Sequence, residues 1–140
     1  MASKNAVAVR KGYEDLANRD VDAVLATYAP NFVVTDHASG ESFKDLGEVR
    51  TWIDGFLTSS TDARITLDQV IDNGDTIVAR IHFAGTNDGV FGPFPATGKQ
   101  FWMDACEVFE FDPDGMVIKE DAYYDQLNTL MQLGHIPAPE

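Results

Sequence analysis

The chain has very few of the residues that mark secreted, zinc-binding or nucleic-acid-binding proteins. Its single cysteine, Cys106, excludes an internal disulfide and any site with several cysteine ligands, and it fits a reducing compartment. Ten Lys and Arg stand against 23 Asp and Glu, and the net charge of −13 repels phosphate backbones and anionic lipids. No run approaches the ~20 apolar residues of a membrane span. We therefore expect a cytoplasmic protein with no nucleic-acid or membrane partner.

Motifs for metals and cofactors are missing as well. The three histidines are scattered and show no His-x-x-x-His spacing. The glycines of residues 85–92 lie in a loop between predicted strands, where a phosphate-binding loop would instead follow a strand and open a helix. We expect no metal site and no cofactor.

The length and composition favour one globular domain over residues 1–140. Hydrophobic residues make up 44% of the chain, too many for a disordered segment. A chain of this length buries roughly 70% of the surface that its unfolded form exposes, so it can hold a core of its own.

Apolar residues recur at helical spacing in the first 60 residues and again near the end, and they predict helices over residues 6–18, 21–28, 46–57 and 127–133. Asp20 and Asp125 are the expected caps of the second and the last of these, and Pro30 the end of the second. A short strand is expected at 32–36. From residue 64 the period changes to two, which predicts strands over 64–72, 75–85, 101–111 and 116–124. Helices followed by an antiparallel meander indicate an α+β fold, with the helices on one face of the sheet.

The last two strands each place a glutamate on their more apolar face. Odd positions of 101–111 and even positions of 116–124 are the apolar ones, so Glu107 and Glu120 both point inward. If residues 112–115 form a four-residue loop, the two glutamates lie opposite each other with their Cβ atoms ~5 Å apart. Two ionised carboxylates would repel at that distance, so one would keep its proton.

A third carboxylate follows the same pattern, because Asp36 shares its parity with Phe32 and Val34. Three acids are therefore expected to converge on the concave side of the sheet, where a cleft can tune them for general acid and base catalysis. The residues alone leave an alternative open. The glutamates would then line a wet rim or pair with a Lys or Arg.

Three segments carry a family resemblance: GTNDGVFGPFPATGK at 85–99, CEVFEFDPDGMV at 106–117 and YYDQLNTLMQLG at 123–134. Together with NRDVDAVLATYAPNFVVTD at 18–36, they resemble the SnoaL-like polyketide cyclase group of the nuclear transport factor 2-like superfamily. The resemblance implies a cone-shaped barrel in which a curved antiparallel sheet wraps around the N-terminal helices. It also implies an apolar pocket, a short C-terminal helix and a homodimer.

The resemblance places functional residues on two positions of this chain. Asp36 falls where ketosteroid isomerases have their general base, and Glu107 falls where they have a protonated acid that donates to the substrate oxyanion. The isomerase tyrosine lands on Gly12, with Tyr13 next to it and rotated by ~100° on a helix. The cyclase aspartate lands on Ala122.

The expected function is therefore a cofactor-independent enzyme on a hydrophobic carbonyl compound, as a cyclase, isomerase or dehydratase that works through an enolate. Asp36 is the expected base, and Glu107, kept protonated by Glu120, the expected donor to the enolate oxygen. The alternative is a module of the same fold that only binds a small hydrophobic ligand or a protein. An epoxide hydrolase ranks lower, because the predicted core faces carry no arginine.

Aromatic and apolar residues on the inward faces complete the expected pocket. The expected substrate-binding residues are Tyr13, Phe32, Val34, Trp52, Phe83, Phe91, Phe94, Met103, Phe109, Ala122 and Tyr124. Phe91 and Phe94 are expected to form a lid over the pocket mouth. His82, Trp102 and Cys106 are expected on the outer sheet face, where a homodimer would form.

Overall fold

The computed structural model describes residues 1–139, and four helices lie in this part of the chain. They are α1 (Lys4–Ala17), α2 (Val21–Leu25), α3 (Leu46–Ser59) and α4 (Gln126–Leu133). Each helix begins after a residue whose side chain accepts a backbone N–H of the first turn, namely Ser3, Asp20, Asp45 and Asp125. These caps satisfy amides that have no partner within the helix, which is why the helices begin where they do.

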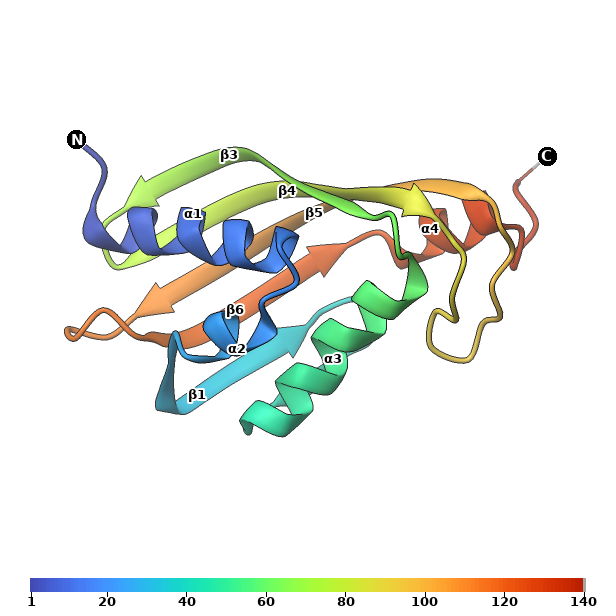
Figure 1. Cartoon of the computed structure of the whole chain (residues 1–140). Coiled ribbons are helices and arrows are strands. Elements are labelled where there is room, and N and C mark those ends of the chain that lie inside the picture. Colours follow the sequence, from blue (N-terminus) through green and yellow to red (C-terminus); the bar gives the residue numbers. More distant parts are fainter. Residues whose placement is uncertain (140) are drawn as a thin grey trace.

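The strands form one six-stranded sheet. They are β1 (Tyr28–Asp36), β2 (Glu41–Phe43), β3 (Arg64–Asn73), β4 (Thr76–Thr86), β5 (Gln100–Phe111) and β6 (Val117–Tyr124), in the spatial order β2-β1-β6-β5-β4-β3. Neighbours pair antiparallel except β1 and β6, which are parallel. The expected α+β class and curved sheet are confirmed, with α1, α2 and α3 on one face (Figure 1). The sheet stays open between its edges β2 and β3, so the barrel itself does not close.

The start of the sheet differs from the prediction. Helix α2 ends at Leu25, and Tyr28 is already the first residue of β1, where it pairs with Val117 of β6. Pro30 contributes to the early end, because a proline in a continued helix would clash with the carbonyl of Ala26 and because it disfavours the helical conformation of Ala29. Its missing N–H is tolerated where the register of β1 against β6 shifts, between Tyr28 and Val33. The short strand β2 was not predicted from its turn-rich sequence.

The hairpin between β5 and β6 has a different register from the predicted one. Asp112 N–H donates to the carbonyl of Met116, so the loop takes one residue more than expected. A second irregularity lies between Glu110 and Phe111. The pairing therefore moves by two residues, and Glu107 lies opposite Ala122 and not Glu120. A shift of two keeps every side chain on its predicted face.

The core lies between the helices and the inner face of the sheet. Helix α1 packs on β3 and β4, and α4 packs on β5 at the other end of the sheet. Val34, Val49 and Ile77 are fully buried in the larger cluster, and Leu133 of α4 joins Phe83 in a smaller one. Among the described residues, no helix is both long and apolar enough to cross a membrane.

Candidate functional site

A cavity of about 330 Å³ lies between the inner face of the sheet and helices α1, α2 and α3. Its wall is almost entirely apolar, and its polar side chains come chiefly from two glutamates and three tyrosines. The predicted pocket residues found in this wall are Tyr13, Trp52, Phe83, Met103, Phe109, Ala122 and Tyr124. The catalytic candidates Glu107 and Glu120 also line it. An apolar cavity with few convergent polar groups is the usual form of a small-molecule site.

Each glutamate accepts a hydrogen bond from a tyrosine. The hydroxyl of Tyr13 donates to Oε1 of Glu107 at 2.8 Å, and the hydroxyl of Tyr28 donates to Oε1 of Glu120 at 2.5 Å. Glu107 is 9% exposed and Glu120 is 4% exposed. Tyr13 thus reaches the site from the helix position next to Gly12, because α1 turns this face toward β5.

Burial and mutual charge govern ionisation of the pair. Burial, and after it the negative charge of Glu107, raise the pKa of Glu120 well above the ordinary value of 4.5. Glu107 also acts on Glu120 as a hydrogen-bond partner, which raises that pKa further, while the hydroxyl of Tyr28 lowers it. Burial and the same two carboxylates raise the pKa of Tyr13 and of Tyr28, so both hydroxyls keep their protons as donors. The environment therefore favours the protonated form of Glu120, which lies beside a second carboxyl group.

Asp36 lies at the inner end of β1, 2% exposed, but it is not among the residues that line the cavity. Its Oδ2 accepts hydrogen bonds from the indole of Trp52 at 2.8 Å and the hydroxyl of Tyr124 at 2.6 Å. Its Oδ1 accepts the backbone N–H groups of Ala38 and Ser39 at 2.9 and 3.0 Å. With four donors already bound, this carboxylate has little capacity to take a proton from a substrate. Asp36 reaches the cavity only through the two aromatic side chains that it holds.

Four expected pocket residues lie elsewhere. Phe32 and Val34 are buried in the core of β1, where Phe32 packs on Tyr28 with ring centroids 4.9 Å apart. Phe91 and Phe94 pair with each other through their backbones in the loop between β4 and β5. Phe91 contacts the cavity only indirectly, because its ring packs against that of Phe56, which does line the wall.

That loop is fixed by a buried asparagine. The side-chain amide of Asn87 donates to the carbonyls of Ser59 and Gly89 at 3.1 and 2.8 Å. Its carbonyl accepts the backbone N–H of Thr97 at 2.9 Å. Asn87 is 0% exposed, so these bonds tie both ends of the loop to the end of α3.

Sequence reasoning missed Tyr28, the partner of Glu120. The helix predicted over 21–28 gave Tyr28 a place on a helix face. Pro30 was the available signal, since it biases Ala29, the residue after Tyr28, toward extended backbone. Phe56 was also missed as a pocket residue, although its helix was predicted.

Among the described residues that line the cavity, none is Arg, Lys or His. An epoxide-hydrolase set that needs an arginine beside two carboxylates is therefore not assembled in this wall. The histidines near the sheet lie instead with acids and aromatics. His37 contacts Asp121 at 2.7 Å and stacks on Tyr123, and His82 contacts Asp68 at 2.8 Å and stacks on Trp102.

Comparison with known proteins agrees with this architecture. The profile of the SnoaL-like domain family matches residues 9–120. A search of the curated proteins gives no match to this sequence. Among solved structures, AclR of Streptomyces galilaeus, a proposed hydroxylase, is 17% identical, with a TM-score of 0.85 over 98% of this chain and 85% of AclR.

Two further structures share the fold. A proposed SnoaL-like polyketide cyclase from Jannaschia sp. CCS1 is 19% identical, with a TM-score of 0.84 over 95% of this chain and 93% of that one. A protein with a ketosteroid isomerase-like fold from Catenulispora acidiphila, in complex with trimethylamine, is 14% identical, with a TM-score of 0.75 over 96% and 95%. At these identities the likeness is one of fold.

Proposed function

The chain belongs to the SnoaL-like family, and from the acid pair in its cavity we propose that it is a cofactor-independent acid–base enzyme acting on a hydrophobic carbonyl compound. The observation that carries this proposal is the Glu107–Glu120 pair, buried in an apolar wall, with a tyrosine hydroxyl on each member. Such a pair offers a proton acceptor and a proton donor within one small, apolar site.

Glu107 takes the role of base in this proposal, and Glu120 the role of acid. The Glu107 carboxylate removes a proton from the carbon next to the substrate carbonyl, and the electrons of that C–H bond form the new C=C bond. The carbonyl π electrons move to oxygen, which accepts a hydrogen bond from the protonated Glu120. A donor aimed at developing charge in an apolar site is worth several kcal/mol, on the order of 3.

Asp36 acts as a positioning residue in place of the base expected from the sequence. Its four hydrogen bonds occupy both carboxylate oxygens, and two of its donors, Trp52 and Tyr124, form part of the cavity wall. It would fix the orientation of these two aromatic side chains against the substrate. Isomerisation, cyclisation and dehydration all start from the same enolate, so the proposal covers a reaction class.

Hydrogen exchange at carbon tests the proposal without a known substrate. The probe is 2-tetralone, a bicyclic ketone, whose C1 hydrogens exchange for deuterium in D2O through the enolate and are followed by ¹H NMR. We expect exchange above the buffer rate with the wild-type protein. We expect E107Q to lose on the order of 10²-fold or more, the range of general-base catalysis.

Glu110→Gln is the matched control for this experiment. Glu110 lies on the same strand but points away from the cavity, where its carboxylate is 3.5 Å from Nζ of Lys119. E110Q should exchange like wild type. Full exchange by E107Q would overturn the assignment of the base.

A binding module without chemistry is the second candidate. It is favoured by the hydrogen bonds within the site, since each glutamate already accepts a tyrosine hydroxyl. Calorimetric binding of 2-tetralone with no exchange above buffer would support this candidate and overturn the enzyme.

A further inference from the structure

The cavity extends along nearly the whole of β5. Five alternate residues of this strand line it: Met103, Ala105, Glu107, Phe109 and Phe111. At ~3.4 Å per residue, they span about 27 Å of strand. A volume of about 330 Å³ spread over such a length describes a long and narrow space.

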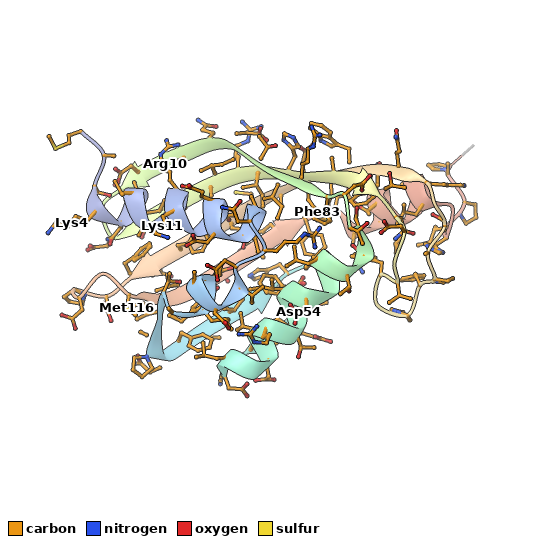
Figure 2. The ribbon with its side chains drawn as sticks, viewed as in Figure 1. Lys4, Arg10, Lys11, Asp54, Phe83 and Met116 are labelled. Atoms are coloured by element: carbon orange, nitrogen blue, oxygen red, sulfur yellow. The ribbon has the colours of Figure 1, made fainter. Side chains whose placement is uncertain are left out.

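Figure 2 labels two of the residues that line the cavity. Phe83 of β4 and Met116 of the β5–β6 loop both line the cavity, and they lie toward opposite ends of the sheet. At the Met116 end, the lining residues Ala26 and Gly115 are exposed to solvent. At the Phe83 end, Phe56 and Tyr124 are only half-buried. Both ends of the cavity therefore approach the surface.

The acid pair lies near the middle of this length. Glu107 is the central member of the five β5 residues, and Glu120 pairs with the next inward residue, Phe109. The wall on either side is apolar, with Phe83 and Met103 on one side and Phe111 and Val117 on the other. A ligand that fills the cavity would place apolar segments on both sides of its polar group.

The charge of the site also limits which ligands the cavity can bind. The described lining residues include no cation, and the chain as a whole carries a net charge of −13. A carboxylate or phosphate placed here would lose its hydration without a cationic partner and would lie beside the two carboxyl groups of Glu107 and Glu120. An uncharged oxygen can instead accept a hydrogen bond from Glu120.

We infer that this cavity takes an uncharged, elongated apolar molecule whose carbonyl lies in the interior of its length, and that it excludes molecules with a terminal acid. This substrate class rests on the proposed function only for the carbonyl. The position of that group and the exclusion of anions follow from the shape and charge of the wall.

Binding of three 15-carbon molecules tests the inference: 8-pentadecanone, 2-pentadecanone and pentadecanoate. Each competes with the fluorescent dye Nile red, whose own Kd is first measured for every variant. We expect 8-pentadecanone to bind at least about tenfold more tightly than either other molecule. The long arm of 2-pentadecanone exceeds one half of the cavity, and a displaced carbonyl leaves the acid pair without a partner. Equal or tighter binding of either other molecule would overturn the inference.

Two glycines provide a matched pair of variants. Gly12 of α1 lines the cavity, whereas Gly55 of α3 is exposed and does not. A Cβ at either position meets no heavy atom within 4 Å, so a side chain can begin at both without a clash at that atom. Gly12→Leu should fill part of the cavity and weaken 8-pentadecanone binding about tenfold or more, while Gly55→Leu should bind like wild type. Unchanged binding by G12L would also overturn the inference.

The proposed acid–base function and the proposed ligand class are tested by different experiments, so either can be wrong while the other stands. If the binding order holds but 2-tetralone does not exchange, the chemistry is wrong and the ligand class stands. If 2-tetralone exchanges but the order of the three molecules does not hold, the ligand class is wrong and the acid–base function stands.

Discussion

Glu107 and Glu120 are diagonal neighbours on the inner face of β5 and β6, and each holds the hydroxyl of a different tyrosine. Glu107 lies opposite Ala122, and Glu120 lies opposite Phe109. The diagonal arrangement keeps the side chains within reach of each other, since such neighbours have Cα atoms roughly 7–8 Å apart. It also leaves room for one tyrosine on each acid. The two glutamates thus form a four-residue unit together with Tyr13 from α1 and Tyr28 from β1.

The raised pKa of Glu120 predicts a pH dependence of stability. A glutamate whose folded pKa is raised binds more protons in the folded than in the unfolded protein, so the free energy of unfolding falls as pH rises. The loss begins near the unfolded value of 4.5 and continues up to the folded pKa, with a slope of at most about 1.4 kcal/mol per pH unit.

Glu120→Gln removes this group, and the difference in stability between E120Q and wild type should shift in favour of E120Q as pH rises from 4.5. Urea unfolding at several pH values between 4 and 8 measures the slope. E110Q, on the outer face, should keep the wild-type slope. Parallel curves for wild type and E120Q would show that Glu120 ionises normally in the folded state.

The hydroxyl of Tyr28 should tune the same equilibrium. Because its hydrogen bond lowers the pKa of Glu120, Tyr28→Phe should move that pKa still higher. The measurement is a ¹³C NMR titration of the labelled glutamate side chains, with the Glu120 signal assigned through E120Q. A Glu120 midpoint that stays in place or falls in Y28F would contradict the assigned hydrogen bond.

Asp36 should matter for the order of the wall and for stability. Asp36→Asn puts an amide group among four donors, and a lost or mismatched buried bond costs about 1–3 kcal/mol. We expect a lower midpoint of urea unfolding and a changed Trp52 fluorescence, together with weaker binding of 2-tetralone.

The carbon-exchange rate of D36N, measured when the variant is saturated with 2-tetralone, distinguishes a positioning role of Asp36 from a role in proton transfer. It should stay within about tenfold of wild type if Asp36 only positions the wall, and fall as far as in E107Q if Asp36 is the base. Asp54→Asn on α3 is the control, because within residues 1–139 only the backbone carbonyl of Asp54, and not its side chain, accepts a hydrogen bond from Thr58.

The outer face of the sheet is where we propose that two copies of this chain meet as a homodimer. Trp102 and Tyr123 are 50% and 46% exposed there, and both aromatic rings are held in place by stacking on histidines. Leu127 of α4, 56% exposed, lines the same surface hollow as Tyr123. Rigid exposed aromatics are typical of interfaces. Light scattering after size exclusion should give about twice 15.4 kDa for wild type and for Val90→Glu, an exposed loop variant. Trp102→Glu should give the monomer, and a wild-type monomer would refute the proposal.

Much of the fold follows from local signals in the sequence. Side-chain caps at Asp20 and Asp125 begin helices where predicted, and alternation predicts the long strands. Tyr28 was misplaced because its helical spacing from Val21 and Leu25 competes with the effect of Pro30. The sheet pairing of Tyr28 with Val117, 89 residues away in sequence, decides the outcome.

The sequence by itself determined that Glu107 and Glu120 face inward, because alternation in a strand fixes the face of each side chain and survives a register shift of two. Only the tertiary structure decided how these acids meet and what they touch. The loop at 112–116 and the irregularity beside Phe111 set the register. Packing of α1 and β1 brought the two tyrosine hydroxyls to the carboxylates, and packing of α3 gave Asp36 its indole donor. Contacts between segments so far apart depend on how helices and strands pack, which no local pattern of residues encodes.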